Sequence, residues 1–549
     1  MNDDTQLQAI QRGKLPRRQV LRAAALFGVG VLGSSLLAAC GQSSGTAAST
    51  PAGSGAGAAA TKPAAAVPTT AATAGSSTAS TPAATAGASS ATAGATVAAT
   101  TGAAAASPTA GTTGATTGAS TTPAAGANAA PQGAGALGYT ARMDAKGNIT
   151  FWHFWGSPVR RNAIRRIVGT FMQLYPGVKV TETFVPFGDI WTKNIAAVAA
   201  GSGMPDVIVE DRPQLRTRAK NNIETSLDDL AKRDAINGQQ FWPFTWEEAV
   251  VEGKPYGLPY ETDIRVLYYN KAVMKDSGLD PEQPPKNWDD LWTMADKLDK
   301  KTGSKLERVA FFPTFGNMGL DQWAWNNGGE WQDKNNNPTL NAKPNVDTLA
   351  WMKKWNDRYG KSEWEAFSGT FGQGNQDGFM TGKVAMKIDI AGYTSFLNFY
   401  NPKMETQDKQ ALGWDVAPVT PAPGQKPASL SGGFALSIPK GSKNMDPAWE
   451  FIKYAVYQGQ ASWARDTYSI PTTEQIAKTD PTLNADPHWK FFIEAMGYGR
   501  PAAFNPYYPT FLETLGPARD AVFSGKQQPQ EAMDEAQKKV EAEIAKNKK

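Results

Sequence analysis

Beyond residue 148, apolar residues recur at two spacings, the two-residue repeat of strands and the longer repeat of helices. Segments of the two kinds alternate along the chain. This order indicates an α/β domain with a mainly parallel sheet, and ligands of such domains bind at the carboxyl ends of the strands. The pattern predicts strands at residues 149–155, 178–185 and 206–209 and helices at residues 160–174 and 190–200, the second helix ending at Gly201.

Three later segments carry local signals of structure. Asn287 and Asp289 stand at the start of a helical pattern, where either side chain would cap the helix. Residues 379–386 predict a helix end followed by a strand, with Gly382 in the left-handed conformation that ends many helices. The apolar run at residues 267–269 is predicted to lie in the core.

The N-terminus has the three parts of an export signal. Residues 1–22 are polar and basic, a weakly apolar run follows at residues 23–39, and this run ends in small residues before Cys40. A transmembrane helix is the alternative, but the run is interrupted by Gly and Ser and is shorter than the ~20 strongly apolar residues that a bilayer span needs. The pattern therefore favours a signal peptide over residues 1–39.

Between the signal and the rest of the chain, residues 40–138 consist almost entirely of Ala, Thr, Gly, Ser and Pro, and Lys62 carries their only charge. A segment of this composition buries too little apolar surface to offset the entropy of ordering. We expect a disordered tether, which as a flexible coil would span roughly 55 Å. Its Thr, Ser and Pro content is typical of O-glycosylated stalks.

Composition changes at Tyr139. All aromatic residues except Phe27 lie from this point onward, in a stretch long enough for two lobes with a core each. Cys40 is the only cysteine of the chain, which excludes an intramolecular disulfide and a cysteine metal site. The formal net charge of +4 is small, so nothing indicates binding to nucleic acid.

Two short motifs at the N-terminus resemble known export and anchoring signals. Residues 37–40, Leu-Ala-Ala-Cys, resemble the bacterial lipobox, in which the cysteine thiol receives diacylglycerol and becomes the mature N-terminus. Residues 17–22 resemble the twin-arginine export motif, although Pro16 stands where that motif has Ser or Thr. The resemblance implies a protein held at the extracytoplasmic face of the cell membrane by a lipid on Cys40.

The globular part carries a series of short motifs. They lie at residues 149–155 (ITFWHFW), 175–180 (YPGVKV), 199–207 (AAGSGMPDV), 254–259 (KPYGLP), 267–271 (LYYNK), 277–280 (SGLD), 287–291 (NWDDL), 379–386 (FMTGKVAM), 432–436 (GGFAL) and 448–453 (AWEFIK). In this order the series resembles the family-1 extracellular solute-binding proteins, the sugar-type receptors of bacterial ABC importers. The resemblance covers roughly residues 148–545, and the family includes the maltose-binding protein.

This resemblance implies two α/β lobes of the class II periplasmic-binding-protein type, joined by a hinge, with the ligand in the cleft between them. Lobes of this kind close over a ligand when a few residues at the crossings absorb the rotation. Binding favours the closed form because only that form contacts the ligand from both sides. By position, lobe 1 comprises residues 139–262 and 428–468, lobe 2 comprises residues 263–427 and 469–549, and the crossings fall at residues 260–263, 427–430 and 468–471.

The candidate ligand-binding residues lie where predicted strands end or where the chain crosses between lobes. Sugars present C–H faces that stack on aromatic rings and hydroxyl groups that need carboxylate or amide partners, so both kinds of side chain are expected. Core packing is the competing interpretation for the tryptophans. The favoured candidates are Trp155, Asp211, Asp263 and Tyr393, and the full set adds Gly156, Glu210, Asn317, Met318, Trp323, Trp325, Asp389, Gly432, Gly433, Tyr507, Tyr508 and Phe511.

The implied function is that of a monomeric receptor that binds a carbohydrate outside the membrane and delivers it to a permease. The ATPase would be a separate chain, because the sequence has no Gly-x-x-x-x-Gly-Lys-Ser/Thr phosphate-binding motif. A secreted carbohydrate-active hydrolase is an alternative, since paired carboxylates suffice for that chemistry, and a sugar-sensing or adhesion lipoprotein is another. His153 and His488 are the only histidines, which excludes a His-rich metal site, and no cofactor is expected.

Overall fold

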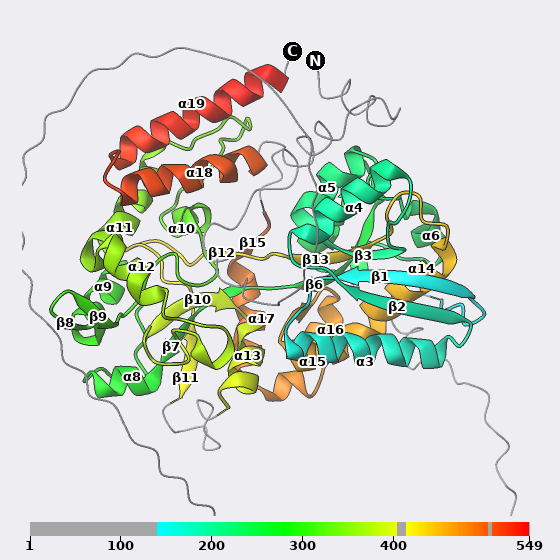
Figure 1. The fold of residues 1–549 in the computed structure, drawn as a ribbon, viewed down its shortest axis with the longest axis horizontal. Helices are drawn as coiled ribbons and strands as arrows, with labels where there is room; N and C mark the ends of the chain where they lie inside the picture. Colours follow the sequence, from blue (N-terminus) through cyan, green and yellow to red (C-terminus); the bar gives the residue numbers. More distant parts are fainter. Residues whose placement is uncertain (1–139, 403–412, 503–507, 548–549) are drawn as a thin grey trace, which may run out of the picture. The chain divides into compact units, whose positions relative to one another are not determined.

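The computed structural model describes residues 140–402, 413–502 and 508–547 of the chain. These residues belong to one compact unit. It contains two main sheets with separate hydrophobic cores (Figure 1). We call the six-stranded sheet and its helices lobe 1, and the three-stranded sheet and its helices lobe 2. Among the described residues, no helix combines the length and apolar character that a membrane crossing requires.

The sheet of lobe 1 has the strand order β14-β6-β13-β3-β1-β2. Its strands are β1 (Gly147–His153), β2 (Val178–Phe184), β3 (Val207–Asp211), β6 (Gly257–Thr262), β13 (Gly433–Ser437) and β14 (Ile470–Pro471). The first three run parallel, as the alternating pattern predicts, but β13 and β14 run antiparallel to their neighbours. The sheet is therefore mixed. The chain returns to this sheet at the end where β6 leaves it, so β13 must run in the direction opposite to β6.

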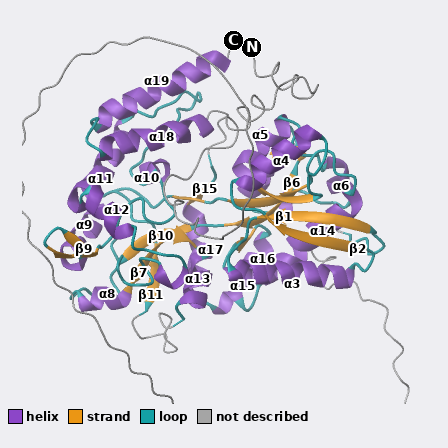
Figure 2. Ribbon diagram, viewed as in Figure 1, coloured by secondary structure: helices purple, strands orange, loops and turns teal. Residues whose placement is uncertain are grey.

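Helices pack on both faces of this sheet (Figure 2). α3 (Pro158–Leu174) begins at Ser157, whose hydroxyl accepts the Arg160 N–H, and the proline needs no partner at the first helical position. α4 (Asp189–Ala200) ends at Gly201 with φ of 69°, as predicted. The other helices of this part are α5 (Arg212–Lys220), α6 (Asp228–Arg233), α7 (Pro243–Ala249), α14 (Met445–Tyr454) and α15 (Gln460–Thr467).

The sheet of lobe 2 has the order β10-β7-β11 and is antiparallel throughout. Its strands are β7 (Arg265–Asn270), β10 (Met386–Ile390) and β11 (Trp414–Ala417). β7 is buried along its whole length, which confirms the core position predicted for residues 267–269. Residues 379–383 form turns instead of the predicted helix end, although Gly382 has the expected positive φ of 69°. The turn follows from Asp377, whose carboxylate accepts two backbone N–H groups ahead of β10.

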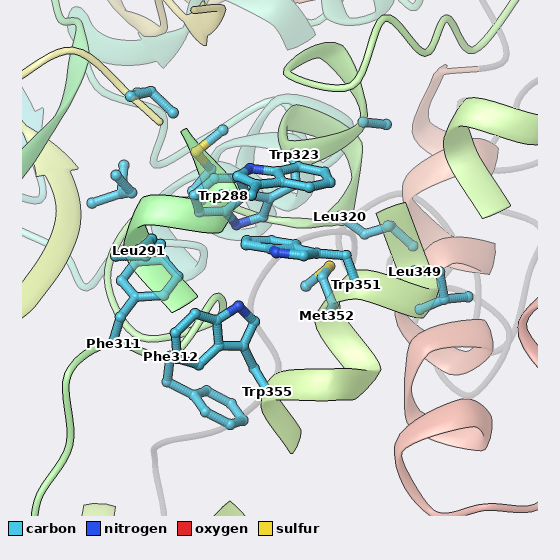
Figure 3. Packing of buried hydrophobic residues seen from close by; sticks show 14 of the residues in the cluster. Trp288, Leu291, Phe311, Phe312, Leu320, Trp323, Leu349, Trp351, Met352 and Trp355 are labelled. Carbon is cyan, nitrogen blue, oxygen red and sulfur yellow. The ribbon is translucent and has the colours of Figure 1, made fainter. Parts of the chain in front are cut away.

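Tryptophans fill the main core of lobe 2 (Figure 3). The rings of Trp288 and Trp351 stack with centroids 4.0 Å apart, and Trp323 packs 5.0 Å from Trp351. These residues come from α9 (Trp288–Leu298), α10 (Leu320–Trp325) and α11 (Lys343–Tyr359). α9 begins at Asn287, whose side chain accepts the backbone N–H groups of residues 289 and 290, so the predicted cap is confirmed.

The remaining elements complete the two lobes and their borders. The helices are α8 (Lys271–Asp276), α12 (Lys361–Ser368), α13 (Tyr393–Tyr400), α16 (Glu474–Thr479), α17 (Pro487–Ala495), α18 (Tyr508–Phe523) and α19 (Pro529–Asn547). The short strands are β4 (Val250–Val251), β5 (Lys254–Pro255), β8 (Lys300–Thr302), β9 (Lys305–Arg308), β12 (Ser429–Leu430) and β15 (Gly499–Arg500). Between the lobes, Asp263 and Ile264 connect β6 to β7, and Ser431 and Gly432 connect β12 to β13.

Candidate functional site

One edge of the lobe 1 sheet lies beside these connections, and it is formed by the ends of its strands, not by an outer strand. In the register of the sheet, Phe434 pairs with Asp211, and Gly433 and Ile470 both pair with Thr262. The carboxyl ends of β3 and β6 therefore meet the amino ends of β13 and β14. Asp211 and Thr262 stand at this edge, which is where α/β sheets bind their ligands.

Lobe 2 presents a matching edge to the connections. Arg265 opens β7 and pairs with Ile390, the last residue of β10. The Asn317 N–H donates to a backbone carbonyl of β10 at 2.8 Å, which places the loop before α10 beside the same strand. The Asp389 carboxylate is fixed by the Lys387 ammonium at 2.8 Å. The structure thus brings Asn317 and Asp389, both predicted from the sequence, to the edge that faces the connections.

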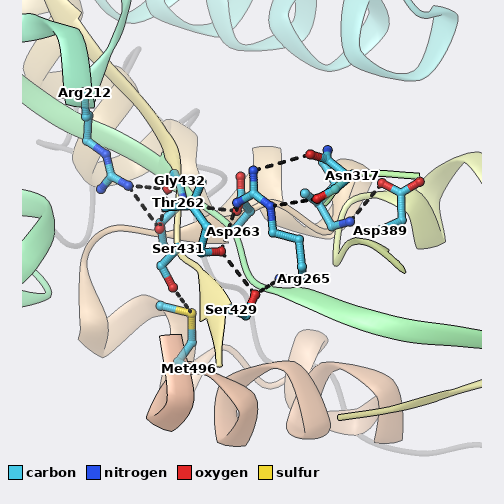
Figure 4. A network of polar contacts seen from close by, with 12 residues as sticks. Arg212, Thr262, Asp263, Arg265, Asn317, Asp389, Ser429, Ser431, Gly432 and Met496 are labelled. Carbon is cyan, nitrogen blue, oxygen red and sulfur yellow. Dashed lines mark hydrogen bonds and ion pairs between the residues drawn. The ribbon is translucent and has the colours of Figure 1, made fainter. Parts of the chain in front are cut away.

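Arg212 and Arg265 join the two edges through Gly432 (Figure 4). From lobe 1, the Arg212 guanidinium donates to the Gly432 carbonyl and, at 3.2 Å, to the Thr262 hydroxyl. From lobe 2, Arg265 pairs with the Asp263 carboxylate, and Asp263 Oδ1 also accepts the Gly432 N–H at 3.1 Å. Both backbone polar groups of Gly432 are therefore held, one through each lobe.

Carboxyl and guanidinium groups are concentrated in this region, and their pKa values reflect it. Burial raises the pKa of Asp211 to about 7, with the Arg212 cation opposing the shift and the Asp263 carboxylate adding to it. Burial also raises the pKa of Glu248 to about 7, again against Arg212, whose Nε lies 3.4 Å from Glu248 Oε2. Carboxyl groups with strongly shifted pKa values are frequent at functional sites.

Four aromatic side chains, Phe154, Phe187, Trp191 and Phe434, form what we call the aromatic surface at the same edge of lobe 1. The Phe154 ring centroid lies 4.7 Å from that of Phe434 and 5.0 Å from that of Phe187, which in turn lies 4.9 Å from Trp191. Phe187 is 49% exposed and the other three are half-buried. Since Phe434 pairs with Asp211, ring surface and polar groups lie side by side.

The sequence prediction chose Trp155 for this role, and the structure places that residue in the core. Successive side chains of a strand point to opposite faces, so Trp155 follows Phe151 and His153 inward. Trp155 is 1% exposed, and its ring lies 4.5 Å from that of Trp463. Phe154 takes the other face and reaches the edge. The two-residue repeat in 149–155 was the signal that could have identified Phe154.

Other predicted site residues lie away from the connections or inside packed regions. Met318, Trp323, Trp325 and Phe511 are buried in the core of lobe 2, and Trp323 donates its indole N–H to a backbone carbonyl at 2.9 Å. These aromatics pack against neighbours that are distant in sequence, a feature that no local pattern reveals. Tyr507 lies outside the described residues, and Tyr508 begins α18, where its side chain is not described.

Four further candidates are held by structural contacts. A side chain at Gly156 would meet the ring of Phe184, and the Glu210 carboxylate is buried against Arg218. Tyr393 donates its hydroxyl to Asp377 at 2.7 Å and is itself largely buried. Gly433 adopts φ of +128°, and a Cβ there would lie 2.1 Å from the Glu261 carbonyl, so only glycine fits beside β6.

The two histidines are engaged in packing. His153 Nδ1 accepts the Trp155 N–H at 3.2 Å and Nε2 lies 3.1 Å from Glu182, while burial lowers its pKa. Both ring nitrogens of His153 are therefore engaged within the core of lobe 1. His488 stacks on Trp414 at 4.4 Å. Within the described ranges, no cluster of His, Cys, Asp and Glu is arranged to hold a metal ion.

The family model of the bacterial extracellular solute-binding proteins matches residues 155–460, and the chain belongs to this family. The resemblance inferred from the motif order is thereby confirmed. Among curated relatives, the arabinooligosaccharide-binding protein of Bacillus subtilis is 28% identical over 318 residues, which make up 56% of this chain and 68% of the relative. The maltodextrin-binding protein of the same organism is 24% identical over 253 residues, 44% of this chain and 56% of the relative.

Solved structures show the same fold. CpMnBP1 with mannotriose bound is 30% identical with a TM-score of 0.64, and the match covers 72% of this chain and all of that one. The GacH receptor of Streptomyces glaucescens has a TM-score of 0.62 at 22% identity, covering 72% of this chain and 97% of its own. The predicted two-lobed α/β fold is confirmed by these similarities.

Proposed function

We propose that this protein binds a carbohydrate, either a mono- or an oligosaccharide, between its two lobes. The observation that carries the proposal is the position of the aromatic surface beside Asp211 and the Arg212–Gly432–Arg265 network. Ring faces stack on the C–H faces of a sugar, and carboxylate and amide groups bind its hydroxyls. Asp263 on the first connection, together with Asn317 and Asp389 on the edge of lobe 2, would supply further polar contacts.

Similarity to sugar-binding proteins supports this proposal. CpMnBP1, whose whole length the chain covers, was solved with mannotriose bound. The B. subtilis relatives are named for arabinooligosaccharides and for maltodextrin. Because these ligands are uncharged oligosaccharides, we infer an uncharged oligosaccharide as the ligand class and take mannotriose as the first probe.

The ligand would then be delivered to an ABC importer. A solute-binding protein presents its cargo to permease subunits, and the ATPase would be a separate chain because this sequence carries no phosphate-binding loop motif. A hydrolase is the second candidate, and the accumulation of carboxylates near Asp211 and Glu248 is what favours it. A receptor returns its ligand intact, whereas a hydrolase releases shorter sugars.

We also propose that a lipid on Cys40 anchors the protein at the extracytoplasmic membrane face. Support comes from the signal-like residues 1–39, the lipobox-like residues 37–40 and the single cysteine of the chain. Residues 40–138 would act as a tether that keeps a monomeric receptor near its permease. A Cys40→Ser variant should move from the membrane fraction to the soluble fraction, and retention in the membrane would contradict the anchor.

The binding proposal is tested by calorimetric titration of the full chain with mannotriose, maltotriose and arabinotriose. We expect saturable binding of one sugar per chain, and chromatography of the recovered sugar should show it unchanged. Steady release of shorter products would show that the protein is a hydrolase and not a receptor. A protein that binds sugar but does not support uptake in a strain lacking the native receptor would instead act as a sensor.

A further inference from the structure

Arg265 contacts three segments of the chain that are far apart in sequence (Figure 4). Its guanidinium pairs with the Asp263 carboxylate on the first connection and donates to the Leu430 carbonyl at 2.9 Å on the return connection. It also reaches the carbonyl and the side-chain oxygen of Asn317 at 3.4 and 3.5 Å. The Arg265 side chain is buried, with 10% of its surface exposed.

These contacts need the shape of arginine as well as its charge. A guanidinium group presents five N–H donors in one plane, whereas a lysine ammonium is a compact charge at the end of a flexible chain. In Arg265 one terminal nitrogen serves Asp263 and Leu430, and the other two nitrogens face Asn317. A lysine could hold one of these partners but not all three.

The pairing also determines which part of Asp263 is available. Oδ1 accepts from Arg265 and from the Gly432 N–H. Among the described residues, none donates a hydrogen bond to Oδ2, and the side chain retains 15% of its surface exposed. Arg265 and Gly432 therefore fix the carboxylate with one oxygen engaged at the connections and the other open to a ligand.

We propose that Arg265 is a positioning residue that holds Asp263 and Asn317 in their ligand-binding arrangement and ties both to the two connections between the lobes. This inference rests on the proposed function. In this role Arg265 acts through the two side chains it holds and needs no contact of its own with the ligand. It couples the conformation of the two connections to the positions of the Asp263 and Asn317 side chains, which sugar hydroxyls would contact.

The first test is a double-mutant cycle on affinity. Arg265→Met is expected to weaken mannotriose binding by about tenfold or more, because the largely buried Asp263 carboxylate loses its cationic partner. Arg265→Lys should also weaken binding, by about fivefold or more, since one ammonium cannot serve three segments. The cycle is completed by Asp263→Asn and by the Asp263→Asn/Arg265→Met double variant. If Arg265 acts through Asp263, the affinity of the double variant will lie within about twofold of that of the single variant that binds more weakly. Additive losses, or full rescue by lysine, would overturn the proposal.

The second test needs no sugar. Hydrogen exchange of the ligand-free full chain should become faster in peptides covering residues 257–270 and 425–437 of the Arg265→Met variant, while α9 and α11 in the tryptophan core of lobe 2 keep their protection. Unchanged exchange in these two peptides would also overturn the proposal. Arg519→Met is the control, because Arg519 in lobe 2 pairs with Asp520 at 2.8 Å on the surface and should change neither readout.

The two tests separate the two claims. If the unmutated protein binds none of the oligosaccharides, the proposed function fails, and the exchange measurement still decides whether Arg265 ties the connections together. If the protein binds mannotriose and the Arg265 variants bind it equally well, the proposed function stands and the positioning role is wrong.

Discussion

Phe187 is the most exposed ring of the aromatic surface, and Phe399 provides a natural comparison. The two side chains are 49% and 50% exposed, but Phe399 lies on α13, where its ring packs 4.9 Å from that of Tyr400. Removing Phe187 deletes ring surface that would stack on the ligand. Because an aromatic contact is worth about 0.5–1.5 kcal/mol, we expect Phe187→Ala to weaken mannotriose binding by up to about tenfold. Calorimetry measures this change directly.

Phe399→Ala is the matched control for this prediction. It removes a ring of the same exposure, so any general effect on solubility or on the surface should be shared by both variants. We expect its affinity for mannotriose to stay within about twofold of that of the unmutated protein. Equal affinities for all three proteins would exclude Phe187 from the site.

Asp211 gives the site a dependence on pH that can be followed through stability. Its pKa rises from an ordinary 3.8 to about 7 in the folded protein, so the folded state binds the extra proton between these values. The stability that this group contributes is complete below pH 4 and is lost as pH rises through about 7. Asp211→Asn removes the effect, and its free energy of unfolding relative to the unmutated protein should rise by up to about 1.4 kcal/mol per pH unit between pH 5 and 7.

Chemical denaturation at pH 5, 6, 7 and 8 measures this difference. The relative stability of Asp211→Asn should climb from pH 5 to pH 7 and level off by pH 8. A difference that stays constant over the whole range would show that Asp211 has an ordinary pKa in the folded protein.

At the scale of elements, Gly433 controls how β13 lies against β6. Its φ of +128° and the close Glu261 carbonyl both exclude a side chain. Gly424 also has a positive φ, +79°, but nothing lies within 4 Å of the position of its Cβ. Gly433→Ala should therefore lose at least about 2 kcal/mol more unfolding free energy than Gly424→Ala. Equal losses in thermal or chemical unfolding would mean that the contact with β6 imposes no constraint.

Many of these elements could be predicted from the sequence, because their signals are local. The strands and helices between residues 147 and 211, the Asn287 cap and the glycine end of α4 all follow from periodicity and capping chemistry. The direction of β13 could not be predicted in this way. It depends on a chain that returns from lobe 2, and no residue within the strand records that path.

The same limit applies to the site. Asp211 and Asp389 could be proposed for the candidate site because they follow predicted strands. Asp263 was proposed from the resemblance, which places it at a crossing, and Asn317 from its position at the start of a helix. The aromatic surface joins the segments after β1 and β2, helix α4 and strand β13, and Phe434 of β13 lies far along the chain from the other three residues. Its members come together only through the tertiary fold. Trp323 and Trp325 were predicted for the site because the local sequence does not show that distant helices bury them.

At the scale of the whole molecule, the account rests on two lobes that share one polar network. Arg212 belongs to lobe 1, Arg265 belongs to lobe 2, and both reach Gly432 or its partner Asp263. A ligand that contacts both edges would stabilise the arrangement in which they face each other. Ligand binding should therefore be coupled to the arrangement of the two lobes.

Hydrogen exchange with and without mannotriose tests this claim most directly. The account predicts that a saturating sugar protects peptides covering residues 184–191 in lobe 1 and residues 387–393 in lobe 2, together with the connections at 262–265 and 430–433. The sugar should be recovered intact. Protection confined to one lobe, or the release of shorter sugars, would contradict a receptor that binds its ligand between two lobes.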